Sequence, residues 1–78
     1  MALIRTIASS TAGNRGRVHG DVECGYTVFE QAGRRYLQLD TYGSSRRVIP
    51  GKVSQTLQFD EDGARRLKRL IEQTFPSI

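Results

Sequence analysis

The hydrophobic period of the chain changes at Asp60, and this change limits the possible folds more than any other feature. From Lys52 to Phe59 apolar and polar residues alternate, as in a strand with one buried face. Asp60 is a good helix N-cap, and Pro76 stops a helix. Between them the apolar residues recur at helical spacing: Ala64, Leu67, Leu70, Ile71 and Phe75. A strand that leads into an amphipathic helix indicates a helix packed on a sheet.

Two earlier segments supply further strands. Gly25 to Gln31 and Arg35 to Tyr42 are rich in aromatic and β-branched residues, and Gly33 separates them, which is typical of a β-hairpin. Residues 3–8 alternate weakly and suggest a first strand. The chain of 78 residues thus predicts one α+β domain over residues 1–78, with an antiparallel sheet of about four strands and one C-terminal helix (60–75) packed on one face. Residues 9–20 predict a flexible Gly/Ser/Arg loop.

The alternation divides the sheet into two faces. The helix-facing residues are expected to be Leu37, Leu39, Val53, Leu57 and Phe59. The open face would then have Tyr36, Gln38, Asp40, Tyr42, Lys52, Ser54, Thr56 and Gln58. If residue 30 pairs with residue 35, Phe29 joins the open face beside Tyr36. A register shifted by one residue places Phe29 on the other face, and the sequence leaves both registers open.

The basic residues are concentrated and are mostly arginine. The net charge is +4, and ten of the twelve basic residues are arginine, whose planar fork suits phosphate and stacks on bases. Residues 34–59 contain one acid, Asp40, against five bases: Arg34, Arg35, Arg46, Arg47 and Lys52. This segregation predicts a basic patch that binds nucleic acid.

The open face adds aromatic rings to this charge. Bases of a single strand stack on tyrosine rings, while cations at the rim hold the phosphates. The candidate nucleic-acid-binding residues are Arg34, Arg35, Tyr36, Gln38, Tyr42, Arg46, Arg47 and Lys52. Two other interpretations stay open. The tyrosines can simply stabilise cross-strand pairs, or this face or a sheet edge can form a homodimer.

Catalytic and metal chemistry find little support. His19, Asp21, Glu23 and Cys24 lie within six residues, but they adjoin a glycine-containing loop, and the chain has one cysteine and one histidine. Helix capping accounts for the acids after Phe59. No apolar run is long enough to cross a membrane. We therefore expect a cytoplasmic protein without cofactor, metal or enzymatic activity, in which association with the nucleoid is an option.

Two stretches also suggest a family. FEQAGRRYLQLDTYGS (29–44) and PGKVSQTLQFDEDGARRLKRLI (50–71) together resemble the positive-cofactor-four family of single-stranded DNA-binding transcription coactivators. That resemblance implies a homodimer formed through helix and strands, and melted DNA bound on the sheet. YLQLDTYGS and IPGKVSQTLQFD also look like segments of small bacterial proteins of unknown function, a resemblance that implies no activity.

The leading prediction is a small non-enzymatic protein that binds single-stranded DNA or RNA, expected as a homodimer. The alternative is a protein-interaction or accessory module, homodimeric through a sheet edge or face, with no role on nucleic acid.

Overall fold

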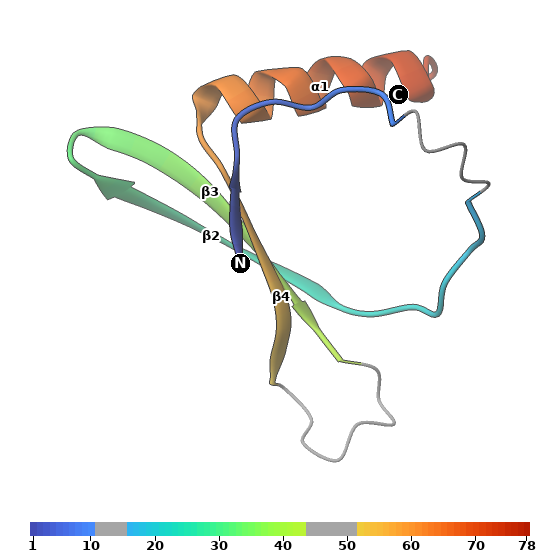
Figure 1. Cartoon of the computed structure of the whole chain (residues 1–78), viewed down its shortest axis with the longest axis horizontal. Coiled ribbons are helices and arrows are strands. Elements are labelled where there is room, and N and C mark those ends of the chain that lie inside the picture. The colour runs from blue at the N-terminus through green and yellow to red at the C-terminus, as the bar shows by residue number, and fades with distance from the viewer. Residues whose placement is uncertain (11–15, 44–51) are drawn as a thin grey trace.

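The computed structural model describes residues 1–10, 16–43 and 52–78 and contains four strands followed by one helix (Figure 1). The elements are β1 (Ala2–Ile4), β2 (Cys24–Gln31), β3 (Arg34–Tyr42), β4 (Val53–Phe59) and α1 (Glu61–Thr74). The predicted α+β class, the C-terminal helix and the hairpin are confirmed. β1 is shorter than the strand predicted over residues 3–8. Residues 9–10 and 16–20 lie in neither helix nor strand, and the rest of the predicted loop is outside the described residues.

The strands form one sheet in the order β1-β4-β3-β2. The β2–β3 and β3–β4 pairs are antiparallel, but β1 runs parallel to β4, so the predicted four-stranded sheet is mixed and mostly antiparallel. Alternation of apolar and polar residues shows which side chains share a face, but it contains no information on strand direction. Direction follows from the path that the chain takes between β1 and β4.

A tight two-residue turn sets the register of the hairpin. Gln31 pairs with Arg34, and the intervening Ala32 and Gly33 have φ angles of 53° and 75°. Two successive residues with positive φ are the signature of a type I′ turn, whose twist matches that of the flanking strands. Glu30 consequently pairs with Arg35, which is the register that places Phe29 opposite Tyr36.

A register shift in β4 moves one residue from its expected face. Thr41 pairs with Gln55, but Tyr42 pairs with Val53, so Ser54 has no direct partner on β3. Val53 therefore lies opposite Tyr42. Simple alternation predicts Val53 on the helix side with Leu57, so this prediction was wrong. An extra residue in one strand is a β-bulge, and it reverses the face of every residue beyond it.

Asp60 joins β4 to α1 and also holds the start of the chain. Its Oδ1 accepts a hydrogen bond of 2.8 Å from the amide of Gly63, which caps the helix. Its Oδ2 lies 3.5 Å from Nε of Arg5, just beyond β1. Gly63 is buried against the carbonyl group of Ile4, where a Cβ atom would overlap the carbonyl oxygen. The helix start, β4 and β1 are thus tied together within one turn of helix.

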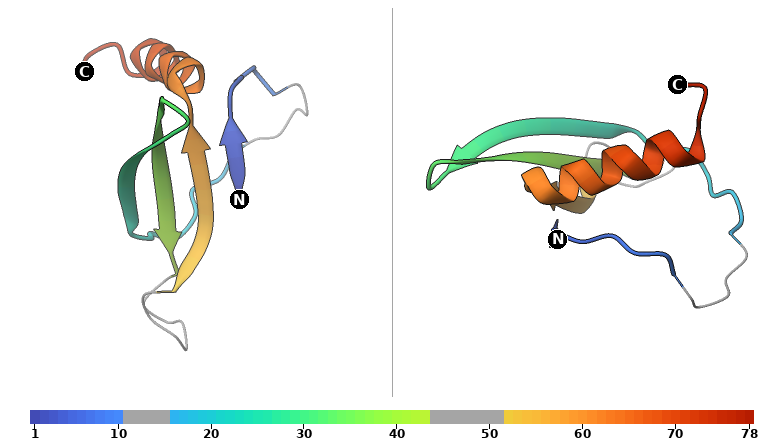
Figure 2. Two further views of the ribbon diagram at one scale, coloured as in Figure 1. Left: turned by 90° about the vertical axis from the view of Figure 1, so that its left-hand side faces the viewer. Right: turned by 90° about the horizontal axis from the view of Figure 1, so that it is seen from above.

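The core of the chain is small. Phe59 is 4% exposed and is the one buried apolar side chain among the described residues. α1 packs on β3 and β4, but Figure 2 shows it at the end of the sheet where β4 finishes, with the strands extending away beneath it. Leu37 and Leu39 are half-buried as expected core residues, whereas Leu57 remains 40% exposed. The predicted helix-on-sheet core therefore forms only in part.

The close contact at Gly63 predicts an unusual response to a helix-favouring substitution. Gly63→Ala gains about 1 kcal/mol of helix propensity. The added methyl group meets the backbone of Ile4, however, and forced overpacking costs about 1–3 kcal/mol and displaces β1. We expect a lower midpoint of thermal unfolding, measured by circular dichroism. Lys68→Ala, an exposed change in the same helix, serves as control, and a more stable Gly63→Ala variant would contradict the packing described.

Candidate nucleic-acid interface

The sheet presents two different faces, as set by the strand register. The apolar face has Val28, Leu37, Leu39, Leu57 and Phe59, and Ala64 of α1 lines a hollow together with Val28, Leu37 and Phe59. The opposite face, here called the polar face, has Phe29, Tyr36, Gln38, Asp40, Tyr42, Thr56 and Gln58. This separation confirms the predicted division of β3 and adds Phe29 to the polar face.

Two aromatic rings stack at the hairpin end of the polar face. The centroids of Phe29 and Tyr36 lie 5.4 Å apart, and the ring planes are inclined by 22°. The two residues are direct cross-strand partners on β2 and β3, and both are half-buried. Their pairing results from the Ala32-Gly33 turn, since a one-residue slip would send Phe29 to the apolar face. Each ring therefore covers part of one face of the other, and the pair forms a compact aromatic cluster at this end of the polar face.

A line of hydrogen-bonded polar side chains crosses the middle of this face. Gln58 Nε2 donates to Gln38 Oε1 at 2.9 Å. Gln38 Nε2 in turn donates to Asp40, at 3.1 Å from Oδ2 and 3.3 Å from Oδ1. The hydroxyl of Thr56 donates to Asp40 Oδ1 at 2.6 Å. The chain Gln58–Gln38–Asp40–Thr56 fixes these side chains in orientation, so that the face is rigid and polar at its centre.

Asp40 is the negative centre of this network. The hydrogen bond from Thr56, followed by that from Gln38, lowers the pKa of Asp40 below its ordinary value, and burial opposes this shift. Asp40 is consequently ionised at neutral pH. Both of its donors come from residues that share its face, one on β4 and one on β3 itself.

Tyr42 lies at the other end of β3 from the aromatic pair. Gly25 packs beside it, because a Cβ atom built on Gly25 would lie 3.3 Å from the Tyr42 hydroxyl oxygen. A glycine at this position leaves room for the ring above β2. Tyr36 and Tyr42 are six residues apart on one strand, so the face between them is about 20 Å long.

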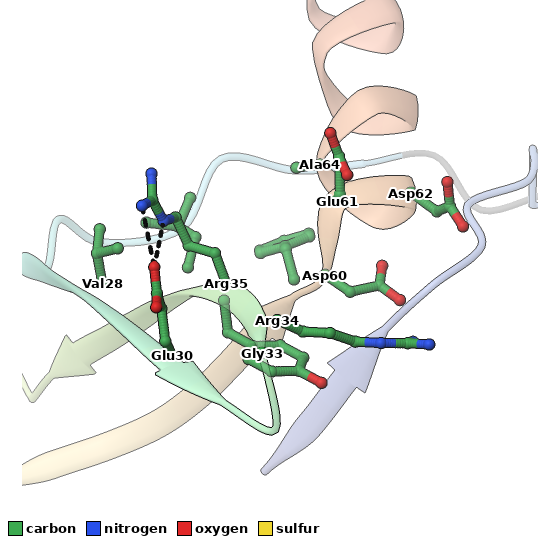
Figure 3. A pocket seen from close by; sticks show the side chains of 12 residues that line it. Val28, Glu30, Gly33, Arg34, Arg35, Asp60, Glu61, Asp62 and Ala64 are labelled. Carbon is green, nitrogen blue, oxygen red and sulfur yellow. Dashed lines mark hydrogen bonds and ion pairs between the residues drawn. The ribbon is translucent and has the colours of Figure 1, made fainter.

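The two adjacent arginines of the hairpin lie on different faces. Arg35 forms an ion pair with Glu30, with 3.0 Å between Arg35 Nη2 and Glu30 Oε1. Arg34 extends away from this pair (Figure 3) and, by its place in β3, belongs with Tyr36. Arg34 is exposed and makes no ion pair with any residue that the structure describes. The structure therefore brings Arg34 to the predicted site but not Arg35.

Of the remaining predicted cations, the structure describes Lys52. Lys52 is exposed and directly precedes β4, at the same end of the sheet as Tyr42. The register shift at Ser54 reverses the alternation before it reaches Lys52, so the prediction that Lys52 shares a face with Thr56 and Gln58 was wrong. Arg46 and Arg47 lie outside the described residues. Sequence reasoning also missed a second basic surface, where Arg5 and Thr6 line a hollow with part of α1: Asp62, Arg65, Arg66 and Arg69. No local pattern connects Arg5 to the helix, because their proximity arises from the β1–β4 pairing.

The described residues contain no group of three or more histidine, cysteine, aspartate or glutamate side chains that could hold a metal ion. Cys24 is a free, exposed thiol. Within residues 1–10, 16–43 and 52–78, no helix is long and apolar enough to span a membrane. No protein-family model, no curated protein and no solved structure matches this chain. The apolar face and the polar face of the sheet are therefore the basis for assigning a function.

The Thr56–Asp40 hydrogen bond predicts a measurable titration effect. Because the folded-state pKa of Asp40 lies below 3.8, ionised Asp40 stabilises the fold above about pH 4, and this stabilisation is lost as the pH falls through the folded-state value. Thr56→Val removes the principal donor, so the pKa should rise towards 3.8, as measured by NMR titration of the carboxyl carbon. Thr27→Val on the same face should leave it unchanged. An unaltered Asp40 pKa in Thr56→Val would refute this cause.

Proposed function

We propose that this chain is a small, non-enzymatic protein that binds single-stranded DNA or RNA across the polar face. The observation behind the proposal is the Phe29–Tyr36 pair on the polar face of the sheet, continued by a fixed row of polar groups. Stacking on such rings tolerates any base, because every base has a π-face. In a duplex those π-faces are covered by neighbouring base pairs, so a ring platform favours unpaired strands.

The charges on this face favour one orientation of a bound nucleic-acid strand, with its bases towards the sheet. Asp40 is a carboxylate at the centre, which repels phosphate but accepts hydrogen bonds from the exocyclic amino groups of bases. Arg34 supplies a cation at one end of this face, whereas Lys52 lies at the other end of the sheet, beyond the register shift that reverses the faces of β4. The bases would therefore lie inward over the rings and the polar row, and the phosphates outward towards the cations. Arg46 and Arg47 belong to this proposal by their sequence position, between β3 and β4.

The alternative function is a protein-interaction module without a role on nucleic acid. One observation favours it: much of the apolar surface, including Val28 and Leu57, is exposed. That surface lies on the other face of the sheet from Tyr36, so both functions can exist in one molecule. We further propose that the protein acts as a homodimer in the cytoplasm.

Replacement of Tyr36 tests the stacking platform. Tyr36→Ala should raise the Kd for a fluorescently labelled single strand by roughly 5- to 150-fold, which corresponds to the loss of one stacked base at about 1–3 kcal/mol. Tyr36→Phe keeps the ring and should bind nearly as the wild type. Fluorescence anisotropy with single-stranded and duplex oligonucleotides measures both. The proposal fails if wild-type protein shows no binding at low salt or prefers the duplex.

The neighbouring arginines give a matched test of the phosphate contacts. Arg34→Ala and Arg35→Ala remove the same charge from adjacent residues on opposite faces. Arg34→Ala should weaken binding and reduce the slope of log K against log salt by about 1. Arg35→Ala should leave that slope nearly unchanged. Equal effects of the two substitutions would mean that net charge, and not the polar face, determines binding.

A further inference from the structure

The hollow between the end of β1 and α1 has an excess of positive charge. Figure 1 shows the chain turning at the end of β1 and continuing alongside α1. Two segments that are far apart in the sequence line the hollow, here called the arginine hollow: Arg5, Thr6, Asp62, Arg65, Arg66 and Arg69. Among these described residues, four guanidinium groups stand against a single carboxylate. Neither segment alone has this concentration of charge.

The ion pairs of the chain leave two of these arginines uncompensated. Asp62 is already engaged, because its Oδ1 lies 2.8 Å from Nη1 of Arg65. Arg66 and Arg69 are exposed and make no ion pair with any residue that the structure describes. Their N–H groups are therefore available to an anion from outside the chain.

Helix stability does not explain the position of these arginines. Cations stabilise a helix near its C-terminus, where the helix dipole is negative. The structure describes α1 in full, and its last turn has no basic residue. By helical spacing, Arg66 and Arg69 also lie opposite the apolar stripe of Ala64, Leu67 and Ile71, so they do not pack on the core. Their position suits an external ligand better than it suits the helix.

We infer that the arginine hollow binds the sugar-phosphate backbone of nucleic acid, at a site separate from the polar face. Guanidinium groups bind phosphate oxygens with two parallel hydrogen bonds, and the exposed hydroxyl of Thr6 is a further donor of the kind that contacts phosphate. No aromatic ring is among the described residues that line the hollow, so bases have nothing to stack on. The hollow therefore takes phosphates of paired and unpaired strands alike. Only the identity of the polyanion rests on the proposed function.

The arginine hollow lies at the same end of the sheet as the aromatic pair. Ile4 pairs with Phe59, and Phe59 pairs with Leu37, so these three residues form one row across the sheet. Arg5 and Tyr36 each lie one residue beyond this row, at the same end. Adjacent strands are about 4.8 Å apart, which places the two backbones about 10 Å apart across β4. A single strand stacked on Tyr36 can therefore reach the hollow with neighbouring phosphates.

An anionic membrane fits the hollow less well than nucleic acid does. A helix that binds a membrane surface buries its apolar face in the lipid and keeps its cations beside that face. In α1 the arginines of the hollow and the apolar stripe lie on opposite sides, so both cannot meet one membrane. Binding to a phosphate backbone needs the charges alone.

The test uses a fluorescently labelled duplex of mixed sequence, because its bases are not free to stack. Fluorescence anisotropy at about 50 mM salt should show Arg69→Ala binding roughly tenfold more weakly than the wild type, with the slope of log K against log salt reduced by about 1. Lys68→Ala removes the same charge from the next residue, outside the hollow, and should change little. Arg69→Lys keeps the charge and should retain most of the slope. Circular dichroism checks that each variant is folded.

Three outcomes overturn the inference. They are a wild type that does not bind the duplex at low salt, equal losses for Arg69→Ala and Lys68→Ala, and binding to vesicles of equal parts phosphatidylcholine and phosphatidylserine in place of the duplex. Tyr36→Ala separates the two sites, because it should weaken binding of a single strand and leave duplex binding unchanged. Duplex binding that depends on Arg69, without any preference for single strands, contradicts the proposed function alone. Single-strand binding without duplex binding contradicts the arginine hollow alone.

Discussion

The rest of the structure depends on the two contacts that the carboxylate of Asp60 makes. One oxygen caps α1 through the amide of Gly63, and the other faces Arg5 beyond β1. Because the cap lies directly after the last residue of β4, the helix has to begin at the end of the sheet. The close contact of Gly63 with Ile4 then brings β1 alongside. These contacts set where α1 leaves the sheet, and therefore how much of the sheet it covers.

α1 covers only part of the sheet, and the molecule therefore has two surfaces with different chemistry. On one side several leucine, isoleucine and phenylalanine side chains remain exposed to solvent. On the other side Gln38, Asp40, Thr56 and Gln58 satisfy one another through hydrogen bonds, so this face is stable in water without a partner. The two faces of the sheet therefore differ in how far the single chain satisfies their side chains.

The amount of sequence information differs between the elements of the candidate site. The placement of Tyr36, Gln38, Asp40 and Tyr42 on one face could be predicted, because a strand alternates strictly with a period of two. The membership of Phe29 could not, since it depended on the length of a turn in which Ala32 adopts a positive φ that sequence rules reserve mainly for glycine and asparagine. Val53 was assigned to the wrong face, because an unpaired Ser54 interrupts the alternation without any change in composition.

The sequence by itself determined the α+β class, the helix boundaries at Asp60 and Pro76, and the two-faced character of β3, since these depend on local periodicity and capping. Only the tertiary structure decided that β1 runs parallel to β4, that Arg35 pairs with Glu30, and that the helix stripe extends past its own sheet. Local periodicity records which side chains seek burial. What buries them is a property of chain path and of packing between distant residues, and neither is contained in the order of neighbouring residues.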